Sequence, residues 1–301
     1  MKILVTGSSG FVGQNLIYSL EKDYLIVPLR CRYIKGQKIE VTEDTIIHLS
    51  GKAHDLKKTS NTQEYKEANF ELTKQIFDSF LKSKNSKTFI FISSVKAVAD
   101  RVEDILDEET KPCPKTDYGI SKLNAERYIL SKLLPNGKRV FILRPCMIHG
   151  PNNKGNLNII YNLIQKKIPW PLGNYQNKRS FLSIDNFNFF VHEIIKNSSL
   201  KSNIFNLSDD EQLSTNDIIV LISKTLNIKI KILNIPKLII YILAIVGDYI
   251  KLPINSERLK KLTENYVVSN YKIKKAINKK LPLTASEGLI KTFNSFKKDN
   301  Y

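Results

Sequence analysis

The chain of 301 residues has few residues that could crosslink it or hold a metal ion. Its three cysteines, Cys31, Cys113 and Cys146, are far apart and form no Cys-x-x-Cys pair, and its four histidines are scattered. A disulfide framework and a structural zinc site both need closely spaced groups of such residues. We therefore predict neither a disulfide-stapled domain nor a metal site, which fits a reducing cytosol.

Long apolar runs are also missing. The longest, Leu238 to Gly247, has ten residues, about half of the roughly 20 that span a bilayer. Pro236 suits the first turn of a helix there, and we expect a buried or interfacial helix. The N-terminal residues start a strand without a basic region and an apolar core, so we predict no signal peptide, no transmembrane segment and a cytoplasmic location.

Acidic residues are scarce, because 29 Asp and Glu stand against 47 Lys and Arg and leave a net charge of +18. Such an excess is typical of proteins that bind nucleic acids or anionic membranes. Here the lysines are spread along the whole chain, without interleaved aromatic residues or the spacing of a known nucleic-acid motif. We interpret the charge as a dispersed, solvated surface and expect no nucleic-acid partner, although such a chain would attract a substrate that carries phosphates.

Strand and helix patterns alternate through the first half of the chain. Short apolar runs predict strands at residues 2–6, 24–29, 45–50, 88–93 and 139–145. Apolar residues at helical spacing predict helices at residues 12–20, 64–82 and 118–134. Alternating strands and helices imply right-handed crossovers, so we predict an α/β fold with a Rossmann-type, doubly wound parallel sheet.

The regular alternation ends after Gly150, where the turn-rich sequence GPNNKGN follows. We predict a smaller C-terminal α/β lobe that binds the substrate. The predicted boundaries are residues 1–150, with 180–210 woven back, for the dinucleotide-binding domain, and 151–179 with 211–301 for the substrate lobe.

A glycine-rich turn joins the first predicted strand to the first predicted helix. In VTGSSGFVG, Gly7, Gly10 and Gly13 let the backbone turn tightly and approach a pyrophosphate, while the helix N-terminus presents N–H groups to the anion. In this context the motif predicts a dinucleotide site. The alternative is a glycine-rich turn without a ligand.

The end of the second predicted strand bears on the choice of cofactor. NAD sites usually place an acidic residue there for the ribose 2′-hydroxyl, whereas an arginine accommodates the 2′-phosphate of NADP. This chain has Arg30 at that end, Arg32 two residues later, and no carboxylate before Glu40. We therefore favour NADP(H) slightly over NAD, the alternative for both arginines being surface charge.

The pattern Tyr-x-x-x-Lys could mark a proton-transfer site, but the chain contains it at Tyr18/Lys22, Tyr118/Lys122, Tyr128/Lys132 and Tyr271/Lys275. Only the Tyr118 copy follows a predicted strand that ends in Ser93-Ser94, and strand ends are where ligands bind in open α/β sheets. Tyr118 and Lys122 are one helical turn apart and face the same way. We predict that Tyr118 transfers a proton and that Ser94 hydrogen-bonds the same substrate oxygen. We expect the Lys122 ammonium and the positive nicotinamide ring to lower the pKa of Tyr118 below the usual 10.

Several motifs, in a fixed order, resemble those of the extended short-chain dehydrogenases/reductases in the NAD-dependent epimerase/dehydratase family, which act on nucleotide sugars. The motifs are TGSSGFVG, IIHLSGKAH, YKEAN, FISSVKAVAD, YGISKLNAE, LRPCMIHGP, RSFLSIDN and SEGL. With the glycine turn and Arg30, the resemblance implies a cofactor site formed by Gly7, Gly10, Phe11, Val12, Gly13, Arg30, Leu49, Ser50, Gly51, Asn69, Tyr118 and Lys122. It implies substrate contacts from Ser94, Asn156 and Leu157, with Arg179 on the nucleotide diphosphate, where a guanidinium is a charge-assisted donor.

Departures from the family pattern bear on which of the family's reactions this chain is expected to catalyse. The 4,6-dehydratases carry an acidic pair where this chain has Val95-Lys96, and the UDP-galactose-type epimerases carry Arg-Tyr-Phe-Asn where it has Arg144-Pro145-Cys146-Met147. The remaining motifs look most like those of bacterial reductases of 4-keto sugars that make UDP-N-acetylquinovosamine or UDP-N-acetylfucosamine precursors. One gap between Arg30 and Thr45 is too short for the strand and helix usual there, so the adenine side of the pocket is expected to be abbreviated.

These observations predict an NAD(P)-dependent nucleotide-sugar oxidoreductase that reduces a UDP-4-keto-6-deoxy-N-acetylhexosamine at C4 for surface polysaccharide synthesis. The closest alternative is a 4-epimerase of the UDP-glucose or UDP-N-acetylglucosamine type with tightly bound NAD, and a more distant one is a non-catalytic nucleotide or redox sensor. Family precedent also predicts a homodimer through a four-helix contact made by the helices at residues 64–82 and 118–134. The sugar itself is not determined by the sequence.

Overall fold

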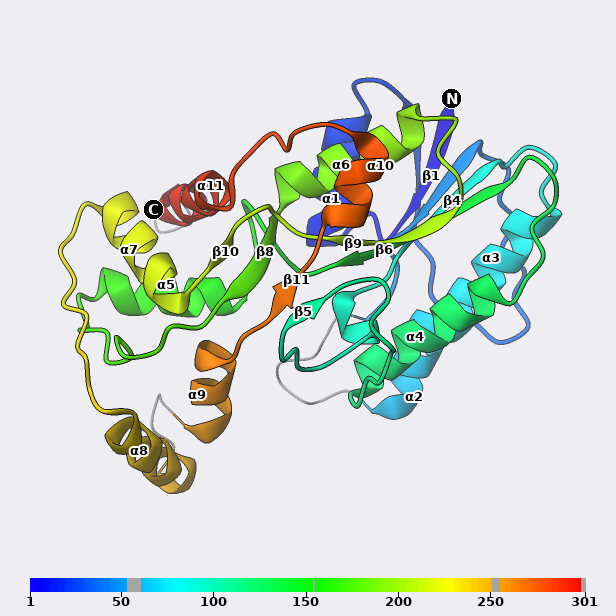
Figure 1. Cartoon of the computed structure of the whole chain (residues 1–301). Coiled ribbons are helices and arrows are strands. Elements are labelled where there is room, and N and C mark those ends of the chain that lie inside the picture. Colours follow the sequence, from blue (N-terminus) through cyan, green and yellow to red (C-terminus); the bar gives the residue numbers. More distant parts are fainter. Residues whose placement is uncertain (53–60, 154, 251–254, 299–301) are drawn as a thin grey trace.

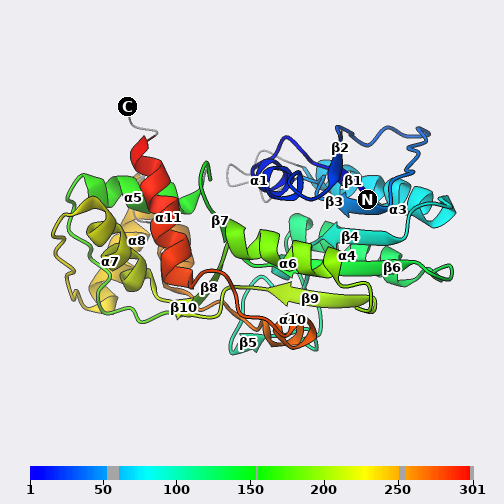
Figure 2. The same cartoon turned by 90° about the horizontal axis from the view of Figure 1, so that it is seen from above.

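The computed structural model describes residues 1–52, 61–153, 155–250 and 255–298. A larger lobe built on a parallel sheet lies beside a smaller, mostly helical lobe, as the two views in Figures 1 and 2 show. Within the described ranges, no helix is long and apolar enough to cross a bilayer.

The larger lobe contains a six-stranded parallel sheet in the order β2-β1-β3-β4-β6-β9. The strands are β1 (Lys2–Thr6), β2 (Leu25–Leu29), β3 (Thr45–His48), β4 (Thr88–Ile92), β6 (Arg139–Pro145) and β9 (Asn203–Leu207). β3 and β4 are buried along their whole length, as expected for strands covered on both faces. The predicted strands and the doubly wound fold are confirmed. The strand order reverses between β1 and β3, which is where such sheets bind ligands.

The connection from β2 to β3 contains neither a helix nor a strand between Arg30 and Asp44. Its only fully buried side chain is Val41, which joins the core beneath it. β2 is therefore an edge strand, and the predicted shortening of this region is confirmed.

Two layers of helices cover the sheet. α1 (Phe11–Leu20) and α6 (Ile184–Lys196) pack on one face, where Leu16, Phe187 and Phe190 enter one core cluster. α3 (Leu72–Lys82) and α4 (Asp117–Leu130) pack on the other face over a second cluster. The sheet thus separates two apolar cores, and its carboxyl ends stay open toward the smaller lobe.

The helix predicted at residues 64–82 is not a regular α-helix. α2 (Thr62–Tyr65) continues into a π-helical segment, η1 (Lys66–Glu71), before α3 begins. The wider turn holds the fully buried Asn69, whose amide hydrogen bonds are made outside the helix, and π segments often occur at functional sites. The helix predicted at residues 118–134 ends earlier, at Leu130, because Leu133 is 95% exposed and gives the last turn no core to pack on.

The smaller lobe is built around its own apolar core. A three-stranded sheet, in the order β10-β8-β7, leads into it. Its elements are β7 (Met147–His149), β8 (Arg179–Ser183), β10 (Gln212–Leu213), α5 (Asn156–Gln165), α7 (Thr215–Leu226), α8 (Lys237–Ile250), α9 (Ser256–Thr263) and α11 (Ala285–Lys298). Ser214 caps α7 as predicted, by accepting a hydrogen bond from the Asp217 N–H.

After β8, the chain returns to the larger lobe with α6 and β9. Residues near the C-terminus also pack there, because β11 (Val267–Val268) pairs with β5 (Ile105–Leu106) and α10 (Tyr271–Ile277) contacts β9. The predicted domain boundaries stay a prediction, to which the structure adds this second return to the sheet.

α8 is a helix, as predicted from its apolar run, but it is not buried. Only Ile240, Ala244 and Gly247 are buried in it, and the rest of its apolar side chains are exposed.

Candidate active site

The glycine turn after β1 has the geometry that a dinucleotide needs. Gly7 has φ of +68°, and a Cβ atom placed on it would lie 2.8 Å from the Ser50 backbone nitrogen. A Cβ on Gly13 would lie 2.2 Å from the Gly7 carbonyl oxygen. Gly10 cannot cap α1 with a side chain and the first turn has no acidic residue, so the first N–H groups of α1 are suited to an anion. The predicted residues Phe11 and Val12 form that turn.

The segment that follows β3 packs directly against this turn, because a Cβ atom on Gly7 would meet the backbone of Leu49 and Ser50. A Cβ atom on Gly51 would lie 2.5 Å from Asn69 Oδ1 and 3.3 Å from Lys122 Nζ. Asn69 accepts a hydrogen bond from the Lys52 N–H at 2.7 Å and donates to the Ser121 hydroxyl at 2.9 Å. Asn69 therefore ties the loop after β3 to α4. Gly51 packs too closely on Asn69 and Lys122 for a larger residue, so the loop after β3 meets α4 beside the turn at Gly7, at the strand ends where a dinucleotide is expected.

α4 is held in place by contacts at its first turn. Asp100 accepts hydrogen bonds from the backbone N–H groups of Lys115 and Thr116, and Thr116 in turn caps the helix. Gly119 packs so closely that a Cβ there would lie 2.4 Å from the Lys96 carbonyl oxygen. This approach brings the start of α4 against Ser94, which caps the short 3-10 turn η2 (Val95–Ala97).

Ser94 and Tyr118 meet at this junction through a side-chain hydrogen bond. Burial raises the pKa of the Tyr118 hydroxyl above its usual value of 10, and the hydrogen bond from Ser94 opposes this effect. In the protein alone the pKa does not fall below 10 as expected, because burial of the phenolate outweighs the hydrogen bond from Ser94, and the effects expected of Lys122 and of a bound nicotinamide stay predictions. The phenol is therefore protonated at neutral pH.

Lys122 lies one turn further along α4 and is only 5% exposed. Its Nζ donates to the Ile92 carbonyl oxygen at 2.9 Å and lies 4.9 Å from the centre of the Phe91 ring. Burial lowers the pKa of Lys122 to about 8, while the nearby Glu126 carboxylate acts in the opposite direction. The lysine thus keeps its charge at neutral pH beside Gly51, at the carboxyl end of β4.

The other Tyr-x-x-x-Lys pairs have a different role. In each, the lysine Nζ lies over the ring of its own tyrosine, at 5.4 Å for Tyr18, 4.7 Å for Tyr128 and 5.9 Å for Tyr271. These are local cation–π contacts of the kind that stabilises exposed helix surfaces. Of the four lysines, only Lys122 points away from the tyrosine of its own pair, and it donates a hydrogen bond to the Ile92 carbonyl oxygen.

A buried ion pair supports α4 from below. Arg144 on β6 binds Glu126 through Nη2–Oε2 at 2.6 Å and Nε–Oε1 at 3.0 Å, and both side chains are at most 4% exposed. The Ser93 hydroxyl donates to the same carboxylate at 2.5 Å. The network links β4, α4 and β6 directly beneath Ser94 and Lys122.

Of the residues predicted for the substrate side, Arg179, Asn156 and Leu157 come from the smaller lobe, and Ser94 from the larger one. Arg179 starts β8, is half-buried, and donates a short hydrogen bond to the Lys261 carbonyl oxygen. Its charge is close enough to Lys96 to lower the pKa of that lysine, which is otherwise lowered mainly by burial. Asn156 is exposed at the first turn of α5, whereas the Leu157 side chain lies in the lobe core, so only its backbone could contact a substrate.

Arg30 is exposed just beyond β2, and no carboxylate stands beside it in the chain. Ser50, by contrast, is 7% exposed and donates its backbone N–H to Thr6. Leu49 packs partly on the core. Arg30, Leu49 and Ser50 thus follow the carboxyl ends of β2 and β3, and their assignment as cofactor contacts stays a prediction.

Sequence reasoning did not assign a role to Tyr65. Its ring lies 6.3 Å from that of Tyr118 in an edge-to-face arrangement, and its hydroxyl helps to raise the pKa of Tyr118. Tyr65 is the first residue of the YKEAN motif, which could have drawn attention to it. The spacing of the motif does not show, however, that a π-helical turn follows Tyr65 and buries Asn69.

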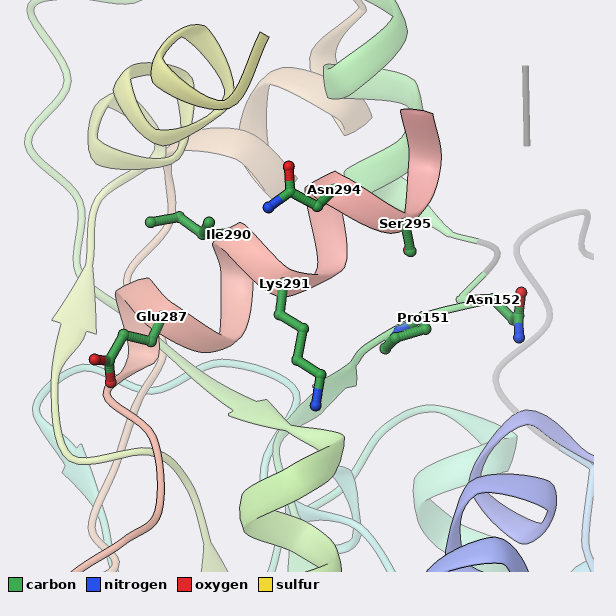
Figure 3. Close-up of a pocket in the computed structure, with 7 residues that line it drawn as sticks. All are labelled: Pro151, Asn152, Glu287, Ile290, Lys291, Asn294 and Ser295. Carbon is green, nitrogen blue, oxygen red and sulfur yellow. The ribbon is translucent and has the colours of Figure 1, made fainter. Parts of the chain in front are cut away.

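A surface hollow of about 620 Å³ lies away from these residues. It is formed by Pro151 and Asn152 on one side and by α11 on the other, as Figure 3 shows. None of Ser94, Tyr118 or Lys122 lines it. Among the described residues, no three His, Cys, Asp or Glu side chains are grouped to hold a metal ion.

Comparison with known proteins agrees with this geometry. Residues 3–208 match the family described as the NAD dependent epimerase/dehydratase family. A Vibrio cholerae relative named UDP-glucose 4-epimerase is 30% identical over 99% of this chain and 96% of its own. An Escherichia coli O157:H7 relative, named N-acetyl-alpha-D-glucosaminyl-diphospho-ditrans,octacis-undecaprenol 4-epimerase, is 27% identical over 91% of this chain and 84% of its own.

A reductase and a solved epimerase structure are also similar to this chain. A Pseudomonas aeruginosa relative named UDP-2-acetamido-2,6-beta-L-arabino-hexul-4-ose reductase is 27% identical over 62% of this chain and 47% of its own. The crystal structure of UDP-glucuronic acid 4-epimerase from Bacillus cereus with NAD shares the fold, with a TM-score of 0.73 and 19% identity over the full length of both chains.

The fold is that of a nucleotide-binding protein of the Rossmann type. The chain belongs to the NAD dependent epimerase/dehydratase family. The predictions of an enzyme, of a nicotinamide cofactor and of nucleotide-sugar chemistry are confirmed at the level of this family.

Proposed function

We propose that this protein reduces the 4-keto group of a nucleotide-activated 6-deoxy-N-acetylhexosamine. The observation that carries the proposal is the cluster of Ser94, Tyr118 and Lys122 at the carboxyl end of β4, in which Tyr118 is a protonated phenol. A protonated group in that place is what the reduction of a carbonyl requires, because the oxygen must receive a proton. UDP is the proposed nucleotide, since two of the relatives are named for UDP-sugars.

Each residue of the site has its own role in the proposed reaction. A nicotinamide, when bound, would supply the hydride that reduces the carbonyl carbon to an alcohol carbon. Tyr118 donates its hydroxyl proton to the sugar oxygen, and Ser94 donates a hydrogen bond that stabilises the phenolate left behind. Lys122, held by the Ile92 carbonyl oxygen, adds a positive charge beside the same site. Arg179 is proposed to bind the diphosphate.

Two features argue for a cofactor that binds and leaves with each turnover. Arg30 lies exposed where a 2′-phosphate would be bound, and the segment from Arg30 to Asp44 provides no helix or strand around an adenosine. An enzyme that consumes coenzyme must exchange it, whereas an epimerase must retain it. We therefore propose NADPH as the preferred donor. Dehydration is not proposed, because Lys96 occupies the position where the dehydratases carry a carboxylate.

The second candidate is a 4-epimerase, which uses the same three side chains twice and turns the 4-keto intermediate between the two transfers. It is favoured by the Vibrio cholerae relative, which is named UDP-glucose 4-epimerase and aligns with 99% of this chain. Tyr118 would then have to act first as a base, and burial disfavours the phenolate in the protein alone.

One experiment separates the two candidates. Purified protein is mixed with a panel of UDP-, dTDP- and GDP-linked 4-keto sugars and either NADPH or NADH, and the loss of coenzyme absorbance is followed. We expect loss with a UDP-4-keto-6-deoxy-N-acetylhexosamine, and a rate about 10²- to 10⁴-fold lower with Tyr118→Phe. Protein that is isolated with tightly held NAD, and that interconverts UDP-sugars without added coenzyme, would establish the epimerase instead.

A further inference from the structure

Exposed apolar side chains are concentrated at the tip of the smaller lobe. Of the 23 large hydrophobic side chains exposed in the described part of the chain, 11 lie between Ile232 and Ile250, and nine of these belong to α8. The exposed fractions reach 69% for Leu238 and 84% for Tyr249. Figure 1 shows α8 at the outer end of the lobe, far from the parallel sheet. A surface of this kind marks an interaction site.

The exposed face covers most of the circumference of α8. Ile240, Ala244 and Gly247 recur at helical spacing and form the narrow buried stripe, which joins the lobe core and packs toward α9. At about 100° per residue, Leu238, Ile242, Ile245 and Tyr249 fall directly opposite that stripe. The small residues of the stripe therefore anchor the helix, while its large residues are directed to the outside.

Basic residues flank this apolar face. Lys229 and Lys231 are exposed in the segment that precedes α8, Lys237 opens the helix, and Arg258 and Lys260 are exposed on α9, which packs against it. Between Lys224 and Lys261 the sequence has eight lysines and arginines against two carboxylates, Asp248 and Glu257, a difference of +6. Asp248 accepts a hydrogen bond from the Ser256 N–H and is partly engaged in joining α8 to α9.

We propose that α8 is a membrane-interface helix, with its apolar face in the acyl boundary of an anionic bilayer and the flanking lysines at the lipid phosphates. An apolar stripe rimmed by lysine and arginine is the pattern of helices that lie in the plane of a membrane. Tyr241, about 100° around the helix from Ile240, lies at the side of the apolar face and suits the headgroup level, where aromatic side chains with a polar end collect. The helix has 14 residues, which at 1.5 Å per residue is about 21 Å, too short for the roughly 30 Å of a bilayer core. It would therefore lie on the membrane and not span it.

The charges favour a lipid surface over a protein partner. Interface cores between proteins are depleted of lysine, whereas each lysine near an anionic membrane adds to binding. The proposal goes beyond the proposed function and does not depend on it, because it concerns a surface remote from Ser94, Tyr118 and Lys122.

The test is flotation of the full chain with vesicles. The probes are vesicles of phosphatidylcholine mixed with phosphatidylglycerol, and vesicles of phosphatidylcholine alone. We expect the protein to float with the anionic vesicles, to float much less with the neutral ones, and to be released by high salt. The variant Leu238→Gln/Ile242→Gln/Ile245→Gln removes apolar surface from the face opposite the buried stripe and should lower binding by about tenfold or more.

A matched control carries the same three changes on other exposed sites, Leu25→Gln/Leu130→Gln/Leu133→Gln, and should bind like the wild type. Circular dichroism and thermal unfolding of both variants check that each is folded. Absence of flotation with anionic vesicles, or equal flotation of the two triple variants, would overturn the proposal. The proposal would also be overturned if the wild type formed a dimer without lipid and only the α8 variant were monomeric. A second copy of the chain would then cover the apolar face.

Discussion

The carbonyl oxygen of Lys96 lies 2.4 Å from the place that a Cβ atom would occupy on Gly119. The turn that carries Ser94 and the helix that carries Tyr118 therefore touch through a position that only glycine fits. A methyl group there must push α4 away from η2, because the opposing atom is backbone. This contact sets the distance between the two hydroxyl groups.

Gly119→Ala should lower turnover by about 100-fold, since a displacement of around 1 Å at a reacting group has an effect of that size. The measurement is kcat with the 4-keto substrate, together with coenzyme binding by fluorescence titration. Ile120→Ala is the matched control, because Ile120 is 40% exposed in the same turn, and it should leave kcat unchanged. Full activity in Gly119→Ala would show that the contact does not position Tyr118.

Tyr118→Phe removes the proposed proton donor and keeps the ring. General acid catalysis contributes about 10²- to 10⁴-fold, so kcat should fall by that amount while the affinity for the coenzyme changes little. Tyr128→Phe tests the same chemistry at the neighbouring Tyr-x-x-x-Lys copy on α4, where the hydroxyl donates to Asp78 at 2.6 Å. That control should keep its kcat. If both variants are equally active, Tyr118 is not the donor.

Lys122 should make stability depend on pH in the alkaline range. Its pKa is about 8 in the folded protein and about 10.4 in an unfolded chain. Between these values the unfolded chain binds more protons, so the contribution of Lys122 to the free energy of unfolding rises with pH across this window and is constant below it. Lys122→Met should remove this rise. The difference between wild type and variant, measured by urea unfolding from pH 7 to about 10, isolates it from other groups that titrate there. Parallel curves for the two proteins would contradict the assignment.

The Glu126–Arg144 pair predicts strong coupling between two substitutions. Removing one partner leaves a buried charge without compensation, so Glu126→Gln or Arg144→Met alone should each cost about 3–5 kcal/mol of unfolding free energy. The double variant should cost less than the sum of the two, because neither charge remains. Urea unfolding of the three variants measures the coupling. Additive losses would mean that the two side chains do not act as a pair.

The sequence predicted the parallel sheet because its signals are local. Continuous apolar runs such as residues 88–92 indicate buried strands, and the turn at Gly7 is identifiable from spacing alone. The short connection after Arg30 could also be predicted, because the residues between Arg30 and Thr45 are too few for a helix and a strand. The Tyr118 copy of Tyr-x-x-x-Lys could be singled out among four because Ser93 and Ser94 end a strand, which is again a feature of short range, and the structure brings Ser94 and Tyr118 into contact.

Other features depend on contacts that sequence spacing does not contain. The π-helical turn that buries Asn69 arises from partners on β3 and α4. The raised pKa of Tyr118 follows from burial, which outweighs the hydrogen bond from Ser94. The exposure of α8 could not be predicted either, because an apolar run of ten residues suits a buried helix equally well, and only the packing of the lobe shows which side has a partner.

Arg30 tests the preference for the coenzyme. It lies exposed at the end of edge strand β2, with no carboxylate nearby in sequence, so Arg30→Glu should cost little stability. A positive charge there favours a 2′-phosphate, and a carboxylate in its place repels the phosphate and can accept from a ribose hydroxyl. Each charge contact in water is worth about 1 kcal/mol, so the ratio of kcat/KM for NADPH over NADH should fall by at least roughly tenfold. Arg32→Glu is the matched control, two residues further along the chain, and should change that ratio less. An unchanged ratio in Arg30→Glu would assign this arginine to the solvated surface and remove the structural argument for NADPH.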